Sequence, residues 1–162
     1  MGVPLPDKGP IRAALPSEAE AVRALVERAY APWVAIIGRR PAPMDDDYPR
    51  HIAAGEVFVF DLGGSIVAVV VIETGAEHLL ADNVAVDPAH QGAGLGRQML
   101  LFVETRARNL GLSEIRLFTH IRMTSNIRLY ERIGFKQTHS AIVDGYHRVF
   151  MAKSIAGTDA PP

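Results

Sequence analysis

Three glycines at alternate positions, Gly92, Gly94 and Gly96, form the feature that most limits what this chain can fold into. The residues before them, 84–86, read as the end of a buried strand, and the apolar residues after them recur at helical spacing. Between a strand and a helix, such a loop can aim successive backbone amides at one phosphate, because glycine carries no side chain and accepts positive φ. The loop therefore indicates a ligand that carries a pyrophosphate.

Several loops of this kind are alternatives. A P-loop ends in Gly-Lys-Ser/Thr, and the chain contains no Gly-Lys pair. The dinucleotide fingerprint needs G-x-G-x-x-G, whereas the spacing here is G-x-G-x-G, and Glu114 precedes the next strand instead of ending it. A third pattern, Q/R-x-x-G-x-G, is filled by Gln91, Gly94 and Gly96. A turn needed only for tight packing of the strand against the helix is the structural alternative.

A second segment separates these alternatives. Residues 123–135 contain Asn126, then Tyr130 four residues later, and close on Gly134 and Phe135. Together with the glycine loop, and in the same order and separation, this segment resembles the two signatures of the GNAT N-acetyltransferase superfamily. The resemblance covers about residues 56–151 and weakens in the N-terminal third.

The pattern of apolar residues predicts alternating elements. Strands are expected at 11–15, 57–60, 66–72, 79–86, 115–120, 135–143 and 146–152. Helices are expected from Ser17, with Glu20 completing a capping box, to about Tyr30, then at 46–54, 95–110 and 124–133, the last capped by Thr124 or Ser125. The resemblance implies an α/β (α+β) fold. Its mixed, mostly antiparallel sheet of about seven strands splays between the fourth and fifth strands and has helices on both faces.

Composition bounds the protein class. The chain has 162 residues, which suits one domain over 10–153, with a flexible segment at 1–9 and a disordered tail at 154–162. A net charge of −1 gives no bulk attraction to nucleic acid or an anionic membrane. The chain has no Cys, so a thiolate metal site and a cysteine nucleophile are excluded, and no metal is expected. With no apolar run of membrane length and no signal-peptide pattern, a cytoplasmic location is expected.

The resemblance implies that acetyl-CoA is the co-substrate. Backbone amides of the glycine loop would hold the pyrophosphate, residues 84–86 would stabilise the thioester carbonyl, and Asn126 would bond the amide-bearing arm of the coenzyme. The expected coenzyme-binding residues are Val84, Ala85, Val86, Gln91, Gly92, Ala93, Gly94, Leu95, Gly96, Arg97, Asn126 and Tyr130. For Arg97 and Asn126, a solvated helix side chain and a plain helix-start residue are the alternatives.

Acetyl transfer to an amine also requires two proton transfers. The family carries its general acid at the position of Tyr130, whose phenol stays protonated at neutral pH. The general base is open between Asp82, which interrupts an apolar strand, Glu73 at the end of the preceding strand, and His120 at the end of a later strand. A paired structural carboxylate is the alternative for Asp82, and a histidine satisfied at the edge of the core is the alternative for His120.

An acceptor pocket is expected from the N-terminal third, at Tyr30, Trp33, Asp47 and Tyr48, because an aromatic and acidic patch suits a cationic amine. A core helix followed by a solvated acidic loop is the alternative. The predicted function is transfer of an acetyl group from acetyl-CoA to a primary amine of a small molecule or peptide, by direct attack in a ternary complex. A non-catalytic coenzyme A sensor of the same fold and, more remotely, a nucleotide-binding oxidoreductase are the other hypotheses. A homodimer is compatible with the sequence.

Overall fold

The computed structural model describes residues 10–155, which divide into two compact units. The first unit comprises the described residues up to Ile72 together with Asn83–Phe102, and the second comprises Glu73–Asp82 together with the described residues from Val103. The strands of the described chain form a seven-stranded sheet in the order β1-β2-β3-β4-β5-β7-β6. The pairs β1–β2, β2–β3, β5–β7 and β6–β7 are antiparallel, and β4–β5 is parallel, so the predicted mixed, mostly antiparallel sheet is confirmed.

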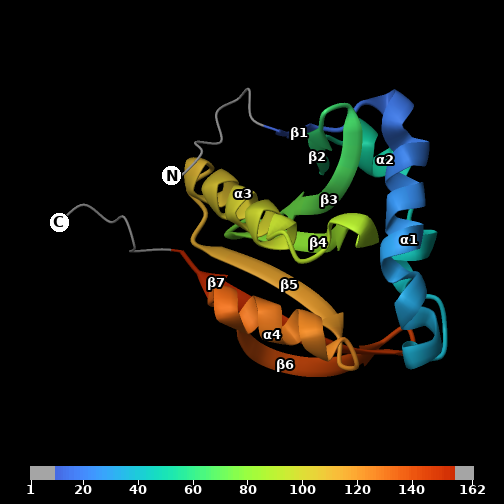
Figure 1. The fold of residues 1–162 in the computed structure, drawn as a ribbon. Helices are drawn as coiled ribbons and strands as arrows, with labels where there is room; N and C mark the ends of the chain where they lie inside the picture. The colour runs from blue at the N-terminus through green and yellow to red at the C-terminus, as the bar shows by residue number, and fades with distance from the viewer. Residues whose placement is uncertain (1–9, 156–162) are drawn as a thin grey trace. The chain divides into compact units, whose positions relative to one another are not determined.

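The first unit begins with β1 (Ile11–Ala13), the short helix η1 (Pro16–Glu18) and α1 (Ala19–Ile37). After η2 (Ala42–Asp45) and α2 (Tyr48–Ala53), the hairpin strands β2 (Val57–Leu62) and β3 (Ser65–Thr74) follow (Figure 1). The end of β4 (His78–Val86), η3 (Pro88–His90) and the start of α3 (Leu95–Asn109) complete it. The glycine loop of this unit runs between η3 and α3.

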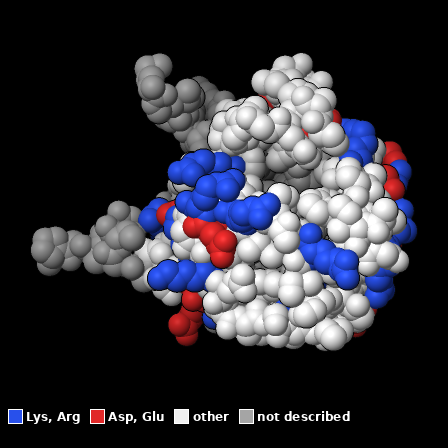
Figure 2. Space-filling model, turned by 60° about the horizontal axis from the view of Figure 1, so that its bottom comes forward, with Lys and Arg blue, Asp and Glu red and all other residues white. Residues whose placement is uncertain are grey.

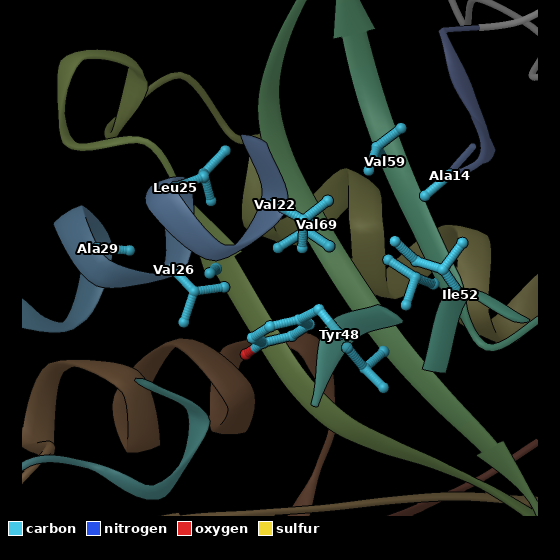
Figure 3. Close-up of a cluster of buried hydrophobic side chains, with 12 residues drawn as sticks. Ala14, Val22, Leu25, Val26, Ala29, Tyr48, Ile52, Val59 and Val69 are labelled. Carbon is cyan, nitrogen blue, oxygen red and sulfur yellow. The ribbon is translucent and has the colours of Figure 1, made fainter. Parts of the chain in front are cut away.

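Helices cover both faces of the sheet in the first unit. One face packs against α1 and α2 in the apolar cluster of Figure 3, where the ring of Tyr48 lies among aliphatic side chains. The members of this cluster are Ala14, Val22, Leu25, Val26, Ala29, Tyr48, Ile52, Val57, Val59, Val69, Val71 and Ala85. On the other face, Phe58 of β2 contacts Phe102 of α3, with ring centroids 5.0 Å apart. Strand alternation separates the two sets, because Phe58 lies between Val57 and Val59.

The second unit contains β5 (Glu114–His120), α4 (Thr124–Ile133), β6 (Lys136–Val143) and β7 (Tyr146–Ser154), with the first part of β4 and the end of α3. In the register of β5 with β7, Ile115, Leu117 and Thr119 lie beside Lys153, Met151 and Val149, and all but Lys153 are buried. Lys153 pairs with Glu104 of α3 at 3.0 Å. The other face of β5 and β7 carries Phe118, Phe150 and Arg148.

Several predicted helix ends are wrong. Glu18, not Ser17, is the N-cap of α1, because residues 16–18 form η1 and the Glu18 carboxylate accepts the Leu15 N–H at 2.8 Å. The helix also continues through Pro32 to Ile37 and ends at Gly38, whose φ is 90°. Helix α4 has Met123 as its N-cap and no side-chain capping bond, so neither Thr124 nor Ser125 caps it.

The C-terminal boundary is also different from the one expected. Ser154 is the last residue of β7 and Ile155 is buried, so the ordered part of the second unit extends beyond residue 153. The expected flexible segment at 1–9 and the rest of the expected tail, 156–162, lie outside the described residues. The division into a single domain stays a prediction.

The surface is of mixed charge. On the face shown in Figure 2, Lys and Arg side chains occur in small groups, the largest beside acidic residues, with uncharged surface between the groups. That face has no continuous basic tract of the kind that tracks a nucleic-acid backbone. Among the described residues, no helix combines the length and apolarity needed to cross a membrane.

Candidate functional site

The glycine loop leaves a row of backbone amides without acceptors. Gly92 and Gly94 have φ of 87° and 81°, in the region that side-chain-bearing residues rarely adopt. The first helical hydrogen bond of α3 runs from Gln98 N–H to the Gly94 carbonyl at 3.0 Å. Within residues 10–155, no backbone carbonyl accepts a hydrogen bond from the amides of residues 92–97. These free donors, at the N-terminus of a helix of 15 residues, suit an anion.

The loop is braced from its N-terminal side. Asp87 caps η3 by accepting the Ala89 N–H at 3.0 Å, and its carboxylate also pairs with Arg28 of α1 at 2.9 Å. These bonds hold the pKa of Asp87 below its usual range. The Gln91 side-chain amide donates to the Val86 carbonyl at 3.2 Å, which ties the loop to the end of β4. Gln91 thus has a structural contact that its place in the motif does not reveal.

The remaining loop residues differ in exposure. Leu95 is buried and anchors the first turn of α3, whereas Gly92, Ala93, Gly94 and Arg97 are exposed. A Cβ added at Gly92 or Gly94 would meet nothing within 4 Å. The space above these two glycines is therefore open to a ligand. A larger side chain at either position would strain the backbone and would occupy the space of that ligand.

Strand β4 alternates in burial along its whole length. Leu79, Ala81, Asn83 and Ala85 are buried, while the residues between them, including Asp82, Val84 and Val86, are half-buried. The sequence prediction that Asp82, Val84 and Val86 share one face is confirmed. Ala85 lies on the other face, in the core of Figure 3. Ala85 was expected among the coenzyme-binding residues, and only its backbone is available for that role.

The buried side-chain amide of Asn83 forms hydrogen bonds with two tyrosines. The Tyr30 hydroxyl donates to Asn83 Oδ1 at 2.7 Å, and Asn83 Nδ2 donates to the Tyr48 hydroxyl at 2.9 Å. The Tyr48 hydroxyl donates in turn to the Pro43 carbonyl. Tyr30 also lies 3.4 Å from the Val84 carbonyl. This network links α1, α2 and the end of β4 inside the first unit.

The expected acceptor residues therefore separate into two kinds. Tyr48 is 1% exposed, so it lies in the core instead of on an aromatic surface patch. Asp47 is exposed, and its carboxylate caps α2 by accepting the Arg50 N–H at 3.1 Å. Tyr30 and Trp33, both on α1, are half-buried. Only this pair and Asp47 are in part open to solvent.

Tyr130 is buried on α4. Its side chain is 7% exposed, and its ring meets Phe135 edge-on with centroids 6.2 Å apart. Burial raises the pKa of Tyr130 to about 12, because the phenolate is disfavoured away from water. Within the described residues, its hydroxyl has no hydrogen-bond partner. Tyr130 is thus a protonated donor at neutral pH whose proton is not used by the protein.

Asn126 lies one helical turn before Tyr130. It is half-buried, and its side-chain amide makes only a long contact of 3.9 Å to Met123 Sδ. Because residues four apart share a helix face, Asn126 and Tyr130 present their polar groups from the same side of α4. The predicted placement of these two residues on one face is confirmed.

The three candidate bases have different surroundings. Burial, followed by the charges of Arg122 and His147, lowers the pKa of His120, so its ring is neutral at pH 7. Its Nδ1 accepts a hydrogen bond from the backbone N–H of Arg122 at 3.1 Å, so the proton of the neutral ring is on Nε2. His120 therefore offers a donor, and it can act as a base only by giving up that bond. Asp82 and Glu73 are half-buried, at positions on β4 and β3.

Two charged clusters were not predicted. In the first unit, His51 is 2% exposed and lies between Glu56, 2.7 Å from Nδ1, and Asp46, 3.0 Å from Nε2. In the second unit, Glu104 is 8% exposed and pairs with Lys153 and Arg108. The spacing of Asp46, His51 and Glu56 by five residues matches no regular repeat, because a loop and a turn bring them together. Only Glu104 with Arg108 shows a sequence signal, the i,i+4 spacing of a helical ion pair.

Comparison with known families decides the class. The sequence profile of the family described as Acetyltransferase (GNAT) domain matches residues 53–137, more than half of the chain. The chain belongs to the GNAT acetyltransferase family. The match includes both the glycine loop and α4, the two segments on which the sequence resemblance was based.

Individual proteins are similar to this GNAT chain over different lengths. A mycothiol acetyltransferase from Streptosporangium roseum is 46% identical over 52 residues, which cover 32% of this chain and 15% of that protein. N-acetyltransferase family 8 member 2 from Rattus norvegicus is 28% identical over 111 residues, which cover 65% of this chain and 46% of that protein. The chain thus spans less than half the length of these relatives.

Solved structures share the fold. The PaiA N-acetyltransferase of Thermoplasma acidophilum, in complex with coenzyme A, aligns with a TM-score of 0.75 at 16% identity, over 89% of this chain and 97% of that one. The ribosomal-protein-S18-alanine N-acetyltransferase of Escherichia coli aligns with a TM-score of 0.71 at 22% identity, over 94% and 98%. At these identities the likeness shows a common fold.

Proposed function

We propose that this GNAT domain is an acetyl-CoA-dependent N-acetyltransferase that moves the acetyl group to a primary amine by direct attack in a ternary complex. The observation that carries the proposal is the row of acceptor-free amides at residues 92–97, in a loop that matches the family's pattern. The coenzyme-bound GNAT structure with the same fold supports the choice of ligand. Because the chain has no Cys, an acetyl-cysteine intermediate is impossible, and direct attack follows.

The neutral amine nitrogen attacks the thioester carbon, and the C–S bond breaks as the new C–N bond forms. The amine loses one proton to a base, and the coenzyme A thiolate gains one from an acid. The protein has to hold the pyrophosphate, stabilise the carbonyl oxygen and manage these two protons.

We assign the pyrophosphate to the amides of the glycine loop, with charge support from Arg97, and the pantetheine amide to Asn126. The general acid is Tyr130, whose raised pKa keeps it protonated at neutral pH. Its proton is shared with the sulfur as the C–S bond breaks. Residues 84–86 provide the backbone for the carbonyl oxygen. These roles follow the family pattern residue by residue, and the unpaired hydroxyl of Tyr130 is consistent with its role.

For the base we propose Asp82, directly or through water. Glu73 remains the next candidate, and His120 follows because its Nδ1 is engaged by Arg122. If Asp82 removes the proton, Asp82→Asn lowers kcat/KM most at neutral pH, and the loss shrinks as pH rises and free amine appears in solution. A pH–rate profile that parallels the wild type at equal height assigns the proton to another residue.

The acceptor is a primary amine of a small molecule or peptide. The names of the similar proteins range from mycothiol acetyltransferase to ribosomal-protein-S18-alanine N-acetyltransferase, so they do not choose between these two kinds of acceptor. Screening amines while following free coenzyme A identifies the acceptor class. Release of coenzyme A from no amine, together with tight acetyl-CoA binding, would instead support a coenzyme sensor.

The loop assignment has a matched test. Gly94→Glu places a carboxylate above the free amides, and Gly55→Glu introduces the same residue at a glycine with similar φ, 74°, and equally open space. Both variants carry a backbone strain of about 1–2 kcal/mol. We expect calorimetry to show acetyl-CoA binding lost in Gly94→Glu and kept in Gly55→Glu. Equal affinities of the two folded variants would refute the assignment.

A further inference from the structure

The face of β5 and β7 that carries Arg148 has an unusual composition. In the antiparallel register, Phe118 lies opposite Phe150 and His120 lies opposite Arg148. The Phe118 and Phe150 rings are 5.8 Å apart between centroids, and His139 of β6 stacks on Phe150 at 4.4 Å with the two planes nearly parallel. This face of the second unit thus carries a row of aromatic rings, Phe118, Phe150 and His139. The row ends at two side chains with N–H donors, His120 and Arg148.

Arg148 is fixed by these rings and by nothing else in the described chain. Its guanidinium carbon lies 4.4 Å from the centroid of the Phe118 ring and 5.9 Å from that of Tyr146. Within residues 10–155, its guanidinium forms no ion pair and donates no hydrogen bond. Stacking holds the plane of a guanidinium and leaves its N–H edges free, which is the arrangement suited to a bidentate anion. Arg148 is only half-buried, so a ligand can reach it.

The surroundings of His120, the register partner of Arg148, add positive potential and a second donor. Burial, followed by the charges of Arg122 and His147, lowers the pKa of His120, so both side chains contribute positive potential at its ring. No carboxylate within the described residues pairs with Arg122, His147 or Arg148. His120, directly opposite Arg148, carries its proton on Nε2 because Nδ1 accepts the Arg122 N–H. A carboxylate that Arg148 holds would thus lie beside a second N–H donor.

The geometry points to an anion-recognition site for the acceptor at this face: Arg148, with the His120 Nε2–H, binds a carboxylate that is part of the amine substrate. The inference rests on the proposed acetyltransferase function and narrows its acceptors to amines that also carry a carboxylate, such as amino acids and acidic peptides. Arg148 is a specificity-determining residue in this assignment. It holds the acceptor and takes no part in the proton transfers.

The test compares matched acceptors. A panel of free amino acids and the corresponding carboxamides is assayed for coenzyme A release with the wild type, Arg148→Met, Arg148→Lys and Arg128→Met. Arg128 is a control because it is an exposed arginine of α4 in the same unit. The N-acetylated acids and their amides are also titrated onto the protein as products, which measures carboxylate binding without turnover.

We expect the wild type to prefer the acids. Arg148→Met should lower kcat/KM for the acids about 10- to 100-fold, mainly through KM, as for loss of a charged bidentate contact. It should leave the carboxamides within about twofold of the wild type. Arg148→Lys should recover part of the loss, since it keeps the charge without the planar fork. Arg128→Met should behave as the wild type.

Other outcomes overturn the inference. Equal use of acids and amides by the wild type, in turnover and in product binding, removes the carboxylate requirement. An equal loss for acids and amides in Arg148→Met gives Arg148 a structural role, and a loss of acetyl-CoA affinity assigns it to the coenzyme. Preference for O-phosphorylated amines over carboxylates replaces the carboxylate by a phosphate. Coenzyme A release from no amine contradicts the proposed function separately, and the product titrations still decide the role of Arg148.

Discussion

Tyr48 and Tyr130 are two buried tyrosines in different environments. Tyr48, in the first unit, is 1% exposed, and its hydroxyl both accepts from Asn83 and donates to the Pro43 carbonyl. Tyr130, in the second unit, is 7% exposed, and within residues 10–155 its hydroxyl has no partner. The Tyr130 hydroxyl is not one of the enclosed polar atoms that lack a partner, so it is open to water or a ligand although the ring is buried. The hydrogen bonds, not the burial, distinguish the structural tyrosine from the candidate catalytic one.

The comparison predicts opposite effects for the same substitution at the two sites. Tyr130→Phe removes the proposed acid and keeps the ring, so kcat should fall about 10²-fold or more, on the scale of general-acid catalysis. The free energy of unfolding should be unchanged or slightly higher, because no protein hydrogen bond is lost. Steady-state kinetics with the identified acceptor and urea denaturation measure the two quantities. Undiminished kcat in this variant would remove Tyr130 from the mechanism.

Tyr48→Phe should show the reverse pattern. It removes the bonds of the Tyr48 hydroxyl with Asn83 Nδ2 and with the Pro43 carbonyl, so the free energy of unfolding should fall by about 1–3 kcal/mol. Tyr30→Phe, at the half-buried end of the same network, should cost less, because water can replace its hydroxyl. For Tyr48→Phe, kcat should stay close to that of the wild type at temperatures where the variant is folded. A large loss of kcat without a loss of stability would place Tyr48 in the reaction instead.

The sequence contained enough information for the strands and the glycine loop. Their signals are local, since glycine permits positive φ, and Gly92 and Gly94 of the loop have it while Gly96 lies in α3. Strand alternation also placed Asp82 and Asn83 on opposite faces. The start of α1 was missed because Ser17 lies inside the short helix η1. Glu18, the last residue of η1, is therefore the N-cap of α1.

The polar network could not be predicted from the sequence. Asn83 interrupts an apolar strand, which indicates a need for partners, but those partners lie 53 and 35 residues away along the chain. A pattern of residue types contains no information on such distances. For the same reason, Tyr48 was expected on a surface patch near Trp33 and instead completes a buried network. Arg148 was missed because its stacking depends on the β5–β7 register.

His51 is a third buried ring with polar partners, and unlike the hydrogen bonds of Tyr48, its bonds to Asp46 and Glu56 depend on whether the ring is protonated. Burial by itself lowers the pKa of His51, but the hydrogen bond to Glu56 and the charge of Asp46 outweigh it and raise the pKa above 6.5. Because the pKa of His51 is higher in the folded than in the unfolded protein, the charged ring stabilises the fold. This stabilisation is fully present below the unfolded pKa and is lost as pH rises through the folded pKa. Only the imidazolium can donate to Glu56 and Asp46 together.

His51→Gln should therefore be less stable than the wild type near pH 5.5, by about 1 kcal/mol for the lost charged bonds. The gap should narrow as pH rises above the raised folded pKa, because neutral His51 can donate to only one carboxylate. Urea denaturation of both proteins from pH 5.5 to 9 measures this gap. His139→Gln is the matched control, since His139 is exposed and its Nδ1 bonds Thr138 instead of a carboxylate. A gap that stays constant with pH, or one that widens, would show that His51 is held neutral. His51 would then resemble Tyr48, paired the same way at every pH.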